Sequence, residues 1–161
     1  MARKDANRAA YWLALLVPAA LLGGAYVSQY GFGLYPCEMC WWQRYPHFAA
    51  IGLALLALAM RGTAAGALLV RLAALAILLS GLIGAFHAGV EYHLWEGITA
   101  CTSATKFGGN PLDAIMNAPV IRCDVAPWTL FGISLAGFNF IFSTAGALLV
   151  LVLAGRKGTG A

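Results

Sequence analysis

The sequence contains few charged residues: of its 161 residues, only six are acidic and ten are basic. This 10% share is far below the roughly 25% of an ordinary globular domain, so charged side chains cannot coat a water-soluble particle of this size. No run of basic residues is longer than two, which argues against nucleic-acid binding. Hydrophobic residues make up 61% of the chain and the mean hydropathy is +0.79. This composition excludes disorder and indicates an integral membrane protein.

Two cofactor signatures are also missing. No glycine fingerprint follows a strand, and no C-x-x-C-H motif is present. The sequence therefore gives no indication of a soluble nicotinamide, a flavin or a covalently attached haem. Glycine itself is abundant, with 19 residues, which suits a membrane bundle because small residues let helices approach closely.

The charged residues divide the chain into four apolar segments. A bilayer core requires roughly 20 helical residues. We therefore predict an all-α fold, an integral membrane four-helix bundle forming one domain over 1–161, with spans at about 9–28, 41–60, 72–90 and 129–154. The apolar part of the second segment, 45–60, is short, so its helix should begin upstream, near 39–42. Two longer loops, at about 29–40 and 91–128, connect the spans on one side.

Basic residues are unequally distributed between the two sides of this bundle. Three lie in or beside the two longer loops, and seven lie on the side of the termini: Arg3, Lys4, Arg8, Arg61, Arg71, Arg156 and Lys157. The positive-inside rule therefore predicts cytoplasmic termini and outward-facing cysteines. The first apolar segment exceeds the roughly 7–15 residues of a signal-peptide core and ends without an A-x-A-like site, so we expect it to remain as a helix.

The second outer loop contains a helix signal of its own. Asn110 suits an N-cap position, Pro111 the first helical position and Asp113 the first turn. Leu112 and Ile115 would share one face. We predict a short helix lying on the membrane surface.

Four cysteines on an oxidising side form an even set that can pair in three ways. A zinc site usually presents two tight cysteine knuckles, which Cys101 and Cys123 do not form, so we expect no metal. A structural disulfide is a reasonable interpretation for these two, since closing a loop of about 23 residues stabilises by roughly 3 kcal/mol. A disulfide between Cys37 and Cys40 closes too small a ring for that benefit.

The C-x-x-C motif instead has a chemical rationale at the start of the second helix. Cys40 would lie in the first turn, where free amides and the helix dipole favour a thiolate. Arg44 follows one turn later on the same face and would favour the thiolate further. Arg44 could equally be an interfacial anchor, and Pro46 could kink or interrupt the helix.

Two outward cysteine pairs indicate electron transfer by thiol–disulfide exchange, and the remaining acceptor is one dissolved in the bilayer, such as a quinone. Arg44 would lie at the depth of the quinone headgroup, and His87 and Glu91 lie one turn apart at the outer end of the third span. His87 could instead bond a backbone carbonyl, Glu91 could belong to a solvated helix end, and Asn139 is typical of interhelical hydrogen bonding.

The run from Tyr35 to Arg44, with its C-x-x-C-x-x-x-R element, resembles the first outer loop of the DsbB family of bacterial disulfide bond formation proteins. The later segments that resemble its second loop are Gly89–Glu91, Cys101, Cys123–Asp124 and Pro127–Trp128. The resemblance implies a quinone-linked thiol oxidase of the bacterial inner membrane, with ubiquinone or menaquinone as acceptor.

The resemblance also implies a role for each cysteine. Cys101 would form a mixed disulfide with a periplasmic DsbA-like protein of thioredoxin fold, with Cys123 as its mate. An inter-loop disulfide would join Cys37 and Cys123, and Cys40 would react with the quinone, whose binding Arg44 supports. The second loop is short before Cys101, so the histidine of the family's loop has no clear counterpart here.

Two other functions compete with this one. A vitamin-K-epoxide-reductase-like protein would carry its C-x-x-C late in the chain, whereas here the motif opens the second helix. A non-catalytic assembly factor or channel subunit would hold the same cysteines as structural disulfides.

Overall fold

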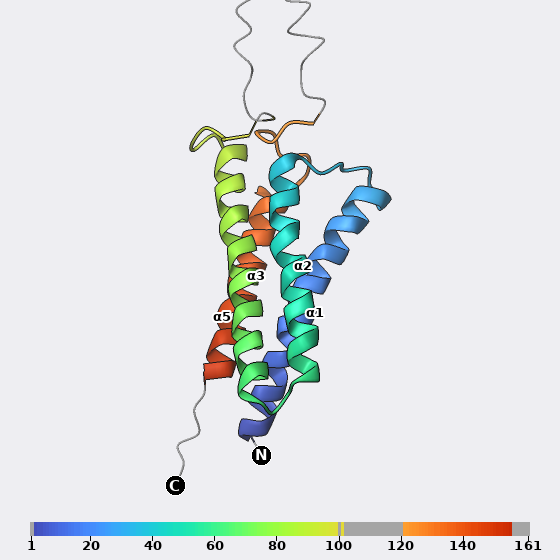
Figure 1. The fold of residues 1–161 in the computed structure, drawn as a ribbon. Coiled ribbons are helices and arrows are strands. Elements are labelled where there is room, and N and C mark those ends of the chain that lie inside the picture. The colour runs from blue at the N-terminus through green and yellow to red at the C-terminus, as the bar shows by residue number, and fades with distance from the viewer. Residues whose placement is uncertain (1, 100, 102–120, 156–161) are drawn as a thin grey trace, which may run out of the picture.

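The computed structural model describes residues 2–99, 101 and 121–155. Within these residues the chain forms four helices and a two-stranded hairpin: α1 (Ala2–Gly31), α2 (Glu38–Ala59), α3 (Ala64–Glu91), β1 (Thr129–Leu130), β2 (Ile133–Ser134) and α5 (Leu135–Gly155). The helices lie side by side in an elongated bundle (Figure 1). The predicted four-helix bundle is confirmed.

Three helices are long and apolar enough to cross a membrane: Arg8–Gly31 within α1, the whole of α3 and the whole of α5. Their outer surfaces expose large apolar side chains, among them Leu16, Leu79 and Leu148. Such a surface is unfavourable in water and suits contact with lipid. The second helix begins at Glu38, upstream of its short apolar segment, as the sequence predicts.

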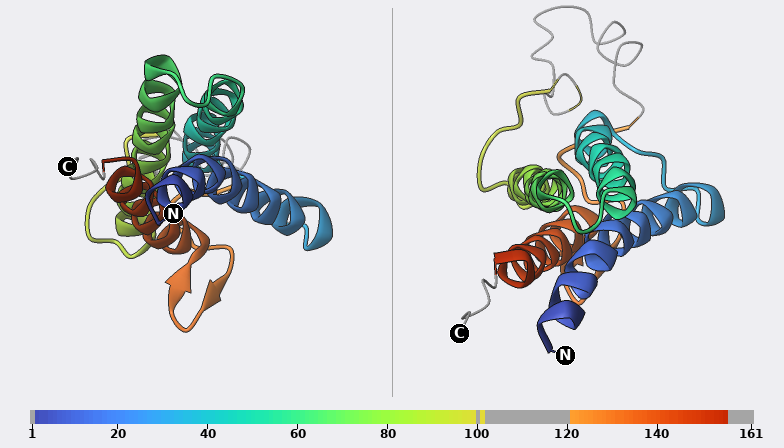
Figure 2. Two further views of the ribbon diagram at one scale, coloured as in Figure 1. Left: turned by 90° about the horizontal axis from the view of Figure 1, so that it is seen from below. Right: turned by 60° about the horizontal axis from the view of Figure 1, so that its bottom comes forward.

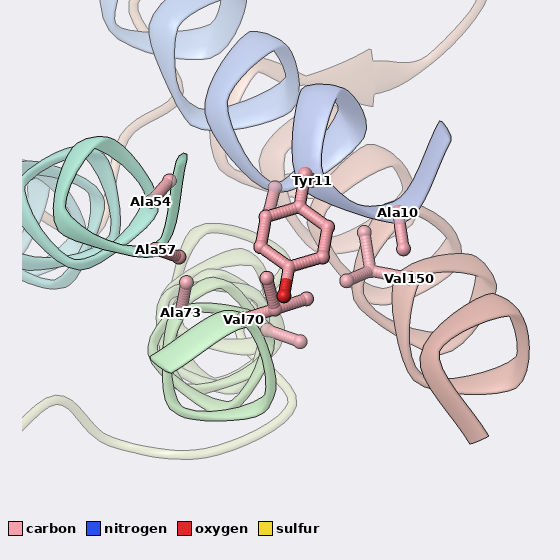
Figure 3. Close-up of a cluster of buried hydrophobic side chains, with 9 residues drawn as sticks. Ala10, Tyr11, Ala54, Ala57, Val70, Ala73 and Val150 are labelled. Carbon is pink, nitrogen blue, oxygen red and sulfur yellow. The ribbon is translucent and has the colours of Figure 1, made fainter. Parts of the chain in front are cut away.

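Small residues fill the contacts between the helices. The helix α3 packs against both α2 and α5, and α1 packs across α2 and α5. Near the end of the bundle where α1 begins, Tyr11 lies among alanines and valines of all four helices (Figure 3). The alanines bring the helix backbones close together, so van der Waals packing holds the bundle where lipid removes the hydrophobic driving force.

The connections that carry the cysteines lie at one end of the bundle, opposite the first turn of α1 and the last turn of α5 (Figure 1). The first of them is shorter than predicted, because α1 continues to Gly31 and α2 begins at Glu38. Only residues 32–37 remain between the two helices. The predicted surface helix beginning at Asn110 lies outside the described residues.

A β-hairpin precedes the last helix, where the sequence predicted helix from residue 129. Thr129 pairs with Ser134, and Phe131 and Gly132 form the turn with φ of 52° and 78°. Two positive φ values are typical of a tight hairpin turn and incompatible with a helix. The hydroxyl of Tyr92 donates to Gly132 O and accepts the N–H of Ser134, both at 2.8 Å. The hairpin projects from the side of the bundle (Figure 2, left).

The contact between α3 and α5 depends on the absence of a side chain at Gly84. A Cβ atom there would lie 3.0 Å from Ala136 O and 3.1 Å from Phe140 N, both backbone atoms of α5. We expect Gly84→Ala to destabilise the protein by about 1–3 kcal/mol, because a helix backbone cannot yield locally. The measurement is the thermal unfolding midpoint in detergent.

Gly52→Ala is the matched control, because a Cβ atom at Gly52 meets nothing within 4 Å. It should leave the midpoint unchanged or raise it, since alanine favours a helix by about 1 kcal/mol over glycine. Equal midpoints for the two variants would contradict the close α3–α5 contact.

Candidate active site

The C-x-x-C motif forms the N-terminus of α2. Cys37 is the N-cap residue, and its Sγ accepts the backbone N–H of Cys40 at 3.3 Å. The two cysteines are free, and their sulfur atoms lie 2.7 Å apart. Cys40 therefore lies in the first helical turn, as predicted, where unpaired amides and the helix dipole favour a thiolate.

The two thiols differ in acidity, and both precede the membrane span predicted from residue 41. The pKa of Cys40 is lowered, chiefly by the hydrogen bond from Cys37 and in part by Arg44, although burial acts in the opposite direction. The pKa of Cys37 is raised, first by its hydrogen bond with Cys40 and then by burial. Cys40 is the more acidic sulfur of the pair, and thus the better candidate for a thiolate.

The second cysteine pair is a disulfide that packs against the first pair. Cys101 and Cys123 are bonded, with their Cα atoms 5.4 Å apart, and Cys123 donates its N–H to Cys101 O. Cys37 and Cys123 are both buried in one apolar cluster, against which Cys40 and Cys101 also pack. Of the three pairings that the sequence allows, the structure contains this one, and it brings the four sulfurs into a single cluster.

His87 lies between the two pairs. Its Nε2 is 3.6 Å from Cys37 Sγ and 3.2 Å from Cys123 O, and its Nδ1 accepts a hydrogen bond from Gln43 Nε2 at 2.8 Å. Because Nδ1 accepts, the proton of the neutral ring is on Nε2. The carbonyl partner that the sequence suggested as an alternative is thus present. The same nitrogen also contacts the motif sulfur.

Glu91 and His93 differ in their surroundings. Glu91 is buried, with Oε1 3.7 Å from His87 Nε2, and its Oε2 has no hydrogen-bond partner among the described residues. Glu91 is the last residue of α3 and is buried, so its interpretation as part of a solvated helix end is wrong. His93 is exposed in a left-handed conformation, and its backbone N–H donates to Val90 O.

Arg44 is buried and turned toward α1. Its Nη1 donates to Gln29 Oε1 at 2.7 Å, and its Nη2 donates to Ala25 O at 3.3 Å. Its guanidinium lies over the rings of Tyr26 and Trp41, about 5 Å from each centroid. Since a guanidinium has five N–H groups, these two bonds leave three for another oxygen. Arg44 therefore ties α2 to α1.

A cavity of about 290 Å³ lies beside the cysteine motif, and Arg44, His87 and Glu91 are among the residues that line it. Leu21, Leu135, Phe138 and Phe142 contribute to its apolar wall. Its polar lining includes Cys40, Gln43, Arg44, His47, His87, Glu91 and Asn139. An apolar, partly aromatic pocket with a few converging polar groups is the usual form of a small-molecule site.

A buried polar network continues from His87 into the bundle. Gln43 Oε1 accepts from Asn139 Nδ2 at 2.8 Å, and Asn139 Oδ1 lies 3.0 Å from His47 Nε2. Ser80 also bonds the backbone of Gln43. Asn139 thus makes the interhelical hydrogen bonds expected of it. Sequence reasoning missed Gln43 and His47, although they follow Cys40 by three and seven residues, a spacing that places helical residues near one face.

Three possible metal-ligand atoms, from Cys37, Cys40 and His87, lie within 4.8 Å of one another. The disulfide engages two of the thiols that a four-cysteine zinc site would need. The same three residues are those that thiol exchange would use. A bundle of membrane helices that holds a thiol pair against a disulfide defines a membrane-embedded dithiol–disulfide protein.

Comparisons with known proteins agree with this class. The family model described as "Disulfide bond formation protein DsbB" matches residues 7–153. The chain is 32% identical to "Disulfide bond formation protein B" of Acidovorax sp. (strain JS42), over 88% of each chain. It is 31% identical to the protein of the same name from Aromatoleum aromaticum, over 96% of each chain. No solved structure matches the chain significantly.

The chain belongs to the DsbB family of disulfide bond formation proteins. It is therefore a helical membrane protein and a disulfide-forming oxidoreductase. The resemblance inferred from the C-x-x-C-x-x-x-R run is confirmed.

The hydrogen bond between the motif sulfurs predicts how Cys40 titrates. In the reduced protein, the rate of Cys40 alkylation by iodoacetamide should rise with pH and level off, with a midpoint below the ordinary thiol value of 9.0. Cys37→Ala removes the hydrogen bond, so the midpoint should move upward toward 9.0. Mass spectrometry of the labelled peptide measures the rate.

Cys37→Ser is the control, because a hydroxyl can still donate to the Cys40 sulfur. Its midpoint should lie between those of the wild type and Cys37→Ala. An unchanged midpoint in Cys37→Ala would show that the neighbouring thiol does not set the acidity of Cys40.

Proposed function

We propose that this protein is a thiol:quinone oxidoreductase that reoxidises a periplasmic DsbA-like thiol oxidase and passes the electrons to a membrane quinone. The observation that carries the proposal is the contact of a free thiol pair with a disulfide, beside a cavity that Cys40 and Arg44 line. A purely structural pair of disulfides would not need free cysteines at a helix N-terminus.

Electrons would enter at the second pair. A thiolate of the partner attacks the Cys101–Cys123 disulfide through Cys101, and the partner's second thiol then displaces Cys101 to complete the partner's own disulfide. The two electrons and the thiol protons then reside on Cys101 and Cys123. The burial of Cys37 with Cys123 in one cluster supports a subsequent exchange through an inter-loop disulfide.

The first pair would then deliver the electrons. The net reaction converts two thiols, Cys37 and Cys40, into a disulfide, while the quinone gains two electrons and two protons and becomes a quinol. The state described above, with Cys37 and Cys40 free and Cys101 bonded to Cys123, corresponds to the step before this transfer. His87 contacts Cys37 and the backbone of Cys123, so it would hold the two cysteine pairs close together.

The cavity suits a quinone headgroup as the second substrate. Its apolar wall would accept the ring, and the remaining N–H groups of Arg44 would donate to a carbonyl oxygen. Glu91 belongs to the same lining, and its buried Oε2, which has no hydrogen-bond partner among the residues that the structure describes, would accept a hydrogen bond from the quinol. Ubiquinone and menaquinone share the two ring carbonyls that this arrangement would recognise.

The site would face the periplasm from the bacterial inner membrane. Both cysteine-bearing connections lie at one end of the bundle (Figure 1), and most basic residues belong to the other end, which the positive-inside rule assigns to the cytoplasm. A periplasmic thiol oxidase could then reach Cys101 from water, while a quinone reaches Cys40 from lipid.

The proposal predicts that Cys40→Ser abolishes quinone reduction. Prereduced protein, mixed in detergent with a short-chain quinone, should reduce it in the wild type. The variant should be slower by at least a hundredfold, because a hydroxyl cannot replace the thiolate. The measurement is the quinone absorbance, and the number of free thiols in each prereduced sample is checked by mass. A variant that reduces quinone at the wild-type rate would refute the role of Cys40.

Arg44→Ala should weaken quinone binding. Loss of a charged hydrogen bond of about 1.5–3 kcal/mol would raise the quinone KM by roughly ten- to a hundredfold. Gln29→Ala removes one of the hydrogen bonds between Arg44 and α1 but keeps the guanidinium, so the quinone KM of this variant should change little. Steady-state kinetics separate the cases: similar KM values for the two variants would make Arg44 a structural anchor only.

A further inference from the structure

A third polar residue shares a helix face with Cys40 and Arg44. His47 follows them by seven and three residues, and at 100° per residue the three side chains lie within about 60° around the axis. His47 is buried and lines the same cavity, about 4.5 Å further along α2 than Arg44. A quinone ring bound between Arg44 and the interior of the bundle would therefore lie against His47.

The hydrogen bonds around His47 fix its tautomer. The Ser80 hydroxyl donates to Gln43 O at 2.8 Å, so its oxygen is left to accept from His47 Nε2 at 2.9 Å. Asn139 donates through Nδ2 to Gln43, so its Oδ1 accepts from His47 Nε2 at 3.0 Å. Two acceptors face Nε2, which therefore carries the proton.

The other ring nitrogen is left without a partner. Nδ1 of His47 is buried and has no hydrogen bond within the described part of the chain. With the proton fixed on Nε2, Nδ1 is a bare acceptor. A buried acceptor without a donor costs about 1–3 kcal/mol. Because His47 lines the cavity, a ligand bound there could supply the missing donor.

We propose that His47 Nδ1 accepts a hydroxyl of the reduced quinone and carries one of the two protons that the quinone gains. This inference rests on the proposed function. A quinone has carbonyl acceptors only, whereas its quinol has two O–H donors. Because Nδ1 is an acceptor without a proton, it favours the quinol, which can donate to it, over the quinone. Arg44 is a donor and does not favour the quinol in this way.

The proton balance is complete within the site. The Cys40 thiol releases its proton and becomes a thiolate, and His47, about 10.5 Å further along α2, takes up one proton at Nδ1 by relay through the cavity that both residues line. The two electrons then pass to the quinone as the Cys37–Cys40 bond forms. One quinone oxygen takes the Cys37 proton and the other takes the proton from His47, which returns to the neutral form. Two thiols and one quinone thus yield one disulfide and one quinol.

Two substitutions at His47 separate its two nitrogens. In His47→Gln the amide can still donate toward Asn139 and Ser80, but Nδ1 is lost. In His47→Asn the shorter amide keeps an acceptor near the position of Nδ1. Neither variant carries a proton. Prereduced protein in detergent is mixed with a short-chain quinone, with and without its quinol, and the limiting rate, quinone half-saturation and quinol inhibition constant are measured.

Both variants should lower the limiting rate by about a hundredfold, the usual contribution of a positioned acid, with quinone half-saturation within about twofold of wild type. His47→Gln should raise the quinol inhibition constant by about three- to tenfold, the loss of one neutral hydrogen bond. His47→Asn should leave it within about twofold. Thermal unfolding in detergent checks that each variant is folded.

Thr144→Val is the matched control. Its Oγ1 is also buried and has no hydrogen-bond partner in the described ranges, but Thr144 is not in the cavity lining. All three kinetic values should equal those of the wild type. Wild-type rate and quinol inhibition in folded His47→Gln would overturn the inference alone. A wild type that reduces no quinone would overturn the proposed function as well.

Discussion

The structure depends on the contact between two sulfur pairs at one end of a bundle that consists mainly of small and apolar residues. Cys37 caps α2 and is buried with Cys123, and His87 bonds to both. This contact needs the helix N-terminus, because the free amides of the first turn can stabilise sulfur charge where water is scarce. It also holds Cys123 against His87 of α3, which lies 36 residues earlier in the chain.

The rest of the bundle supports this contact by satisfying polar groups inside an apolar particle. Arg44 bonds to α1, and Gln43 and Asn139 connect α2, α3 and α5. An unsatisfied polar group in lipid costs several kcal/mol, so such networks hold helices in one arrangement. Because the same residues line the cavity, the groups that hold the helices together also define the surface that a quinone would meet.

Sequence reasoning predicted the four helices, the upstream start of α2 and the family, because apolar length, charge placement and a C-x-x-C-x-x-x-R run are local signals. It failed where distant segments decide the outcome. The hairpin before α5 depends on Tyr92 from the end of α3. Glu91 is buried at a cavity that residues of α2 and α5 also line. The role proposed for His47 was missed because it depends on Ser80 and Asn139, which only the fold places beside it.

The most direct measurement is the redox state of the C-x-x-C pair in the wild-type protein, with and without added quinone. Prereduced protein in detergent is exposed to a short-chain quinone, quenched and labelled with a mass-tagged maleimide. The account predicts that Cys37 and Cys40 take two tags before quinone addition and lose them afterward, without any other oxidant. Tag numbers that are the same in both conditions would contradict it and indicate a protein whose cysteines are only structural.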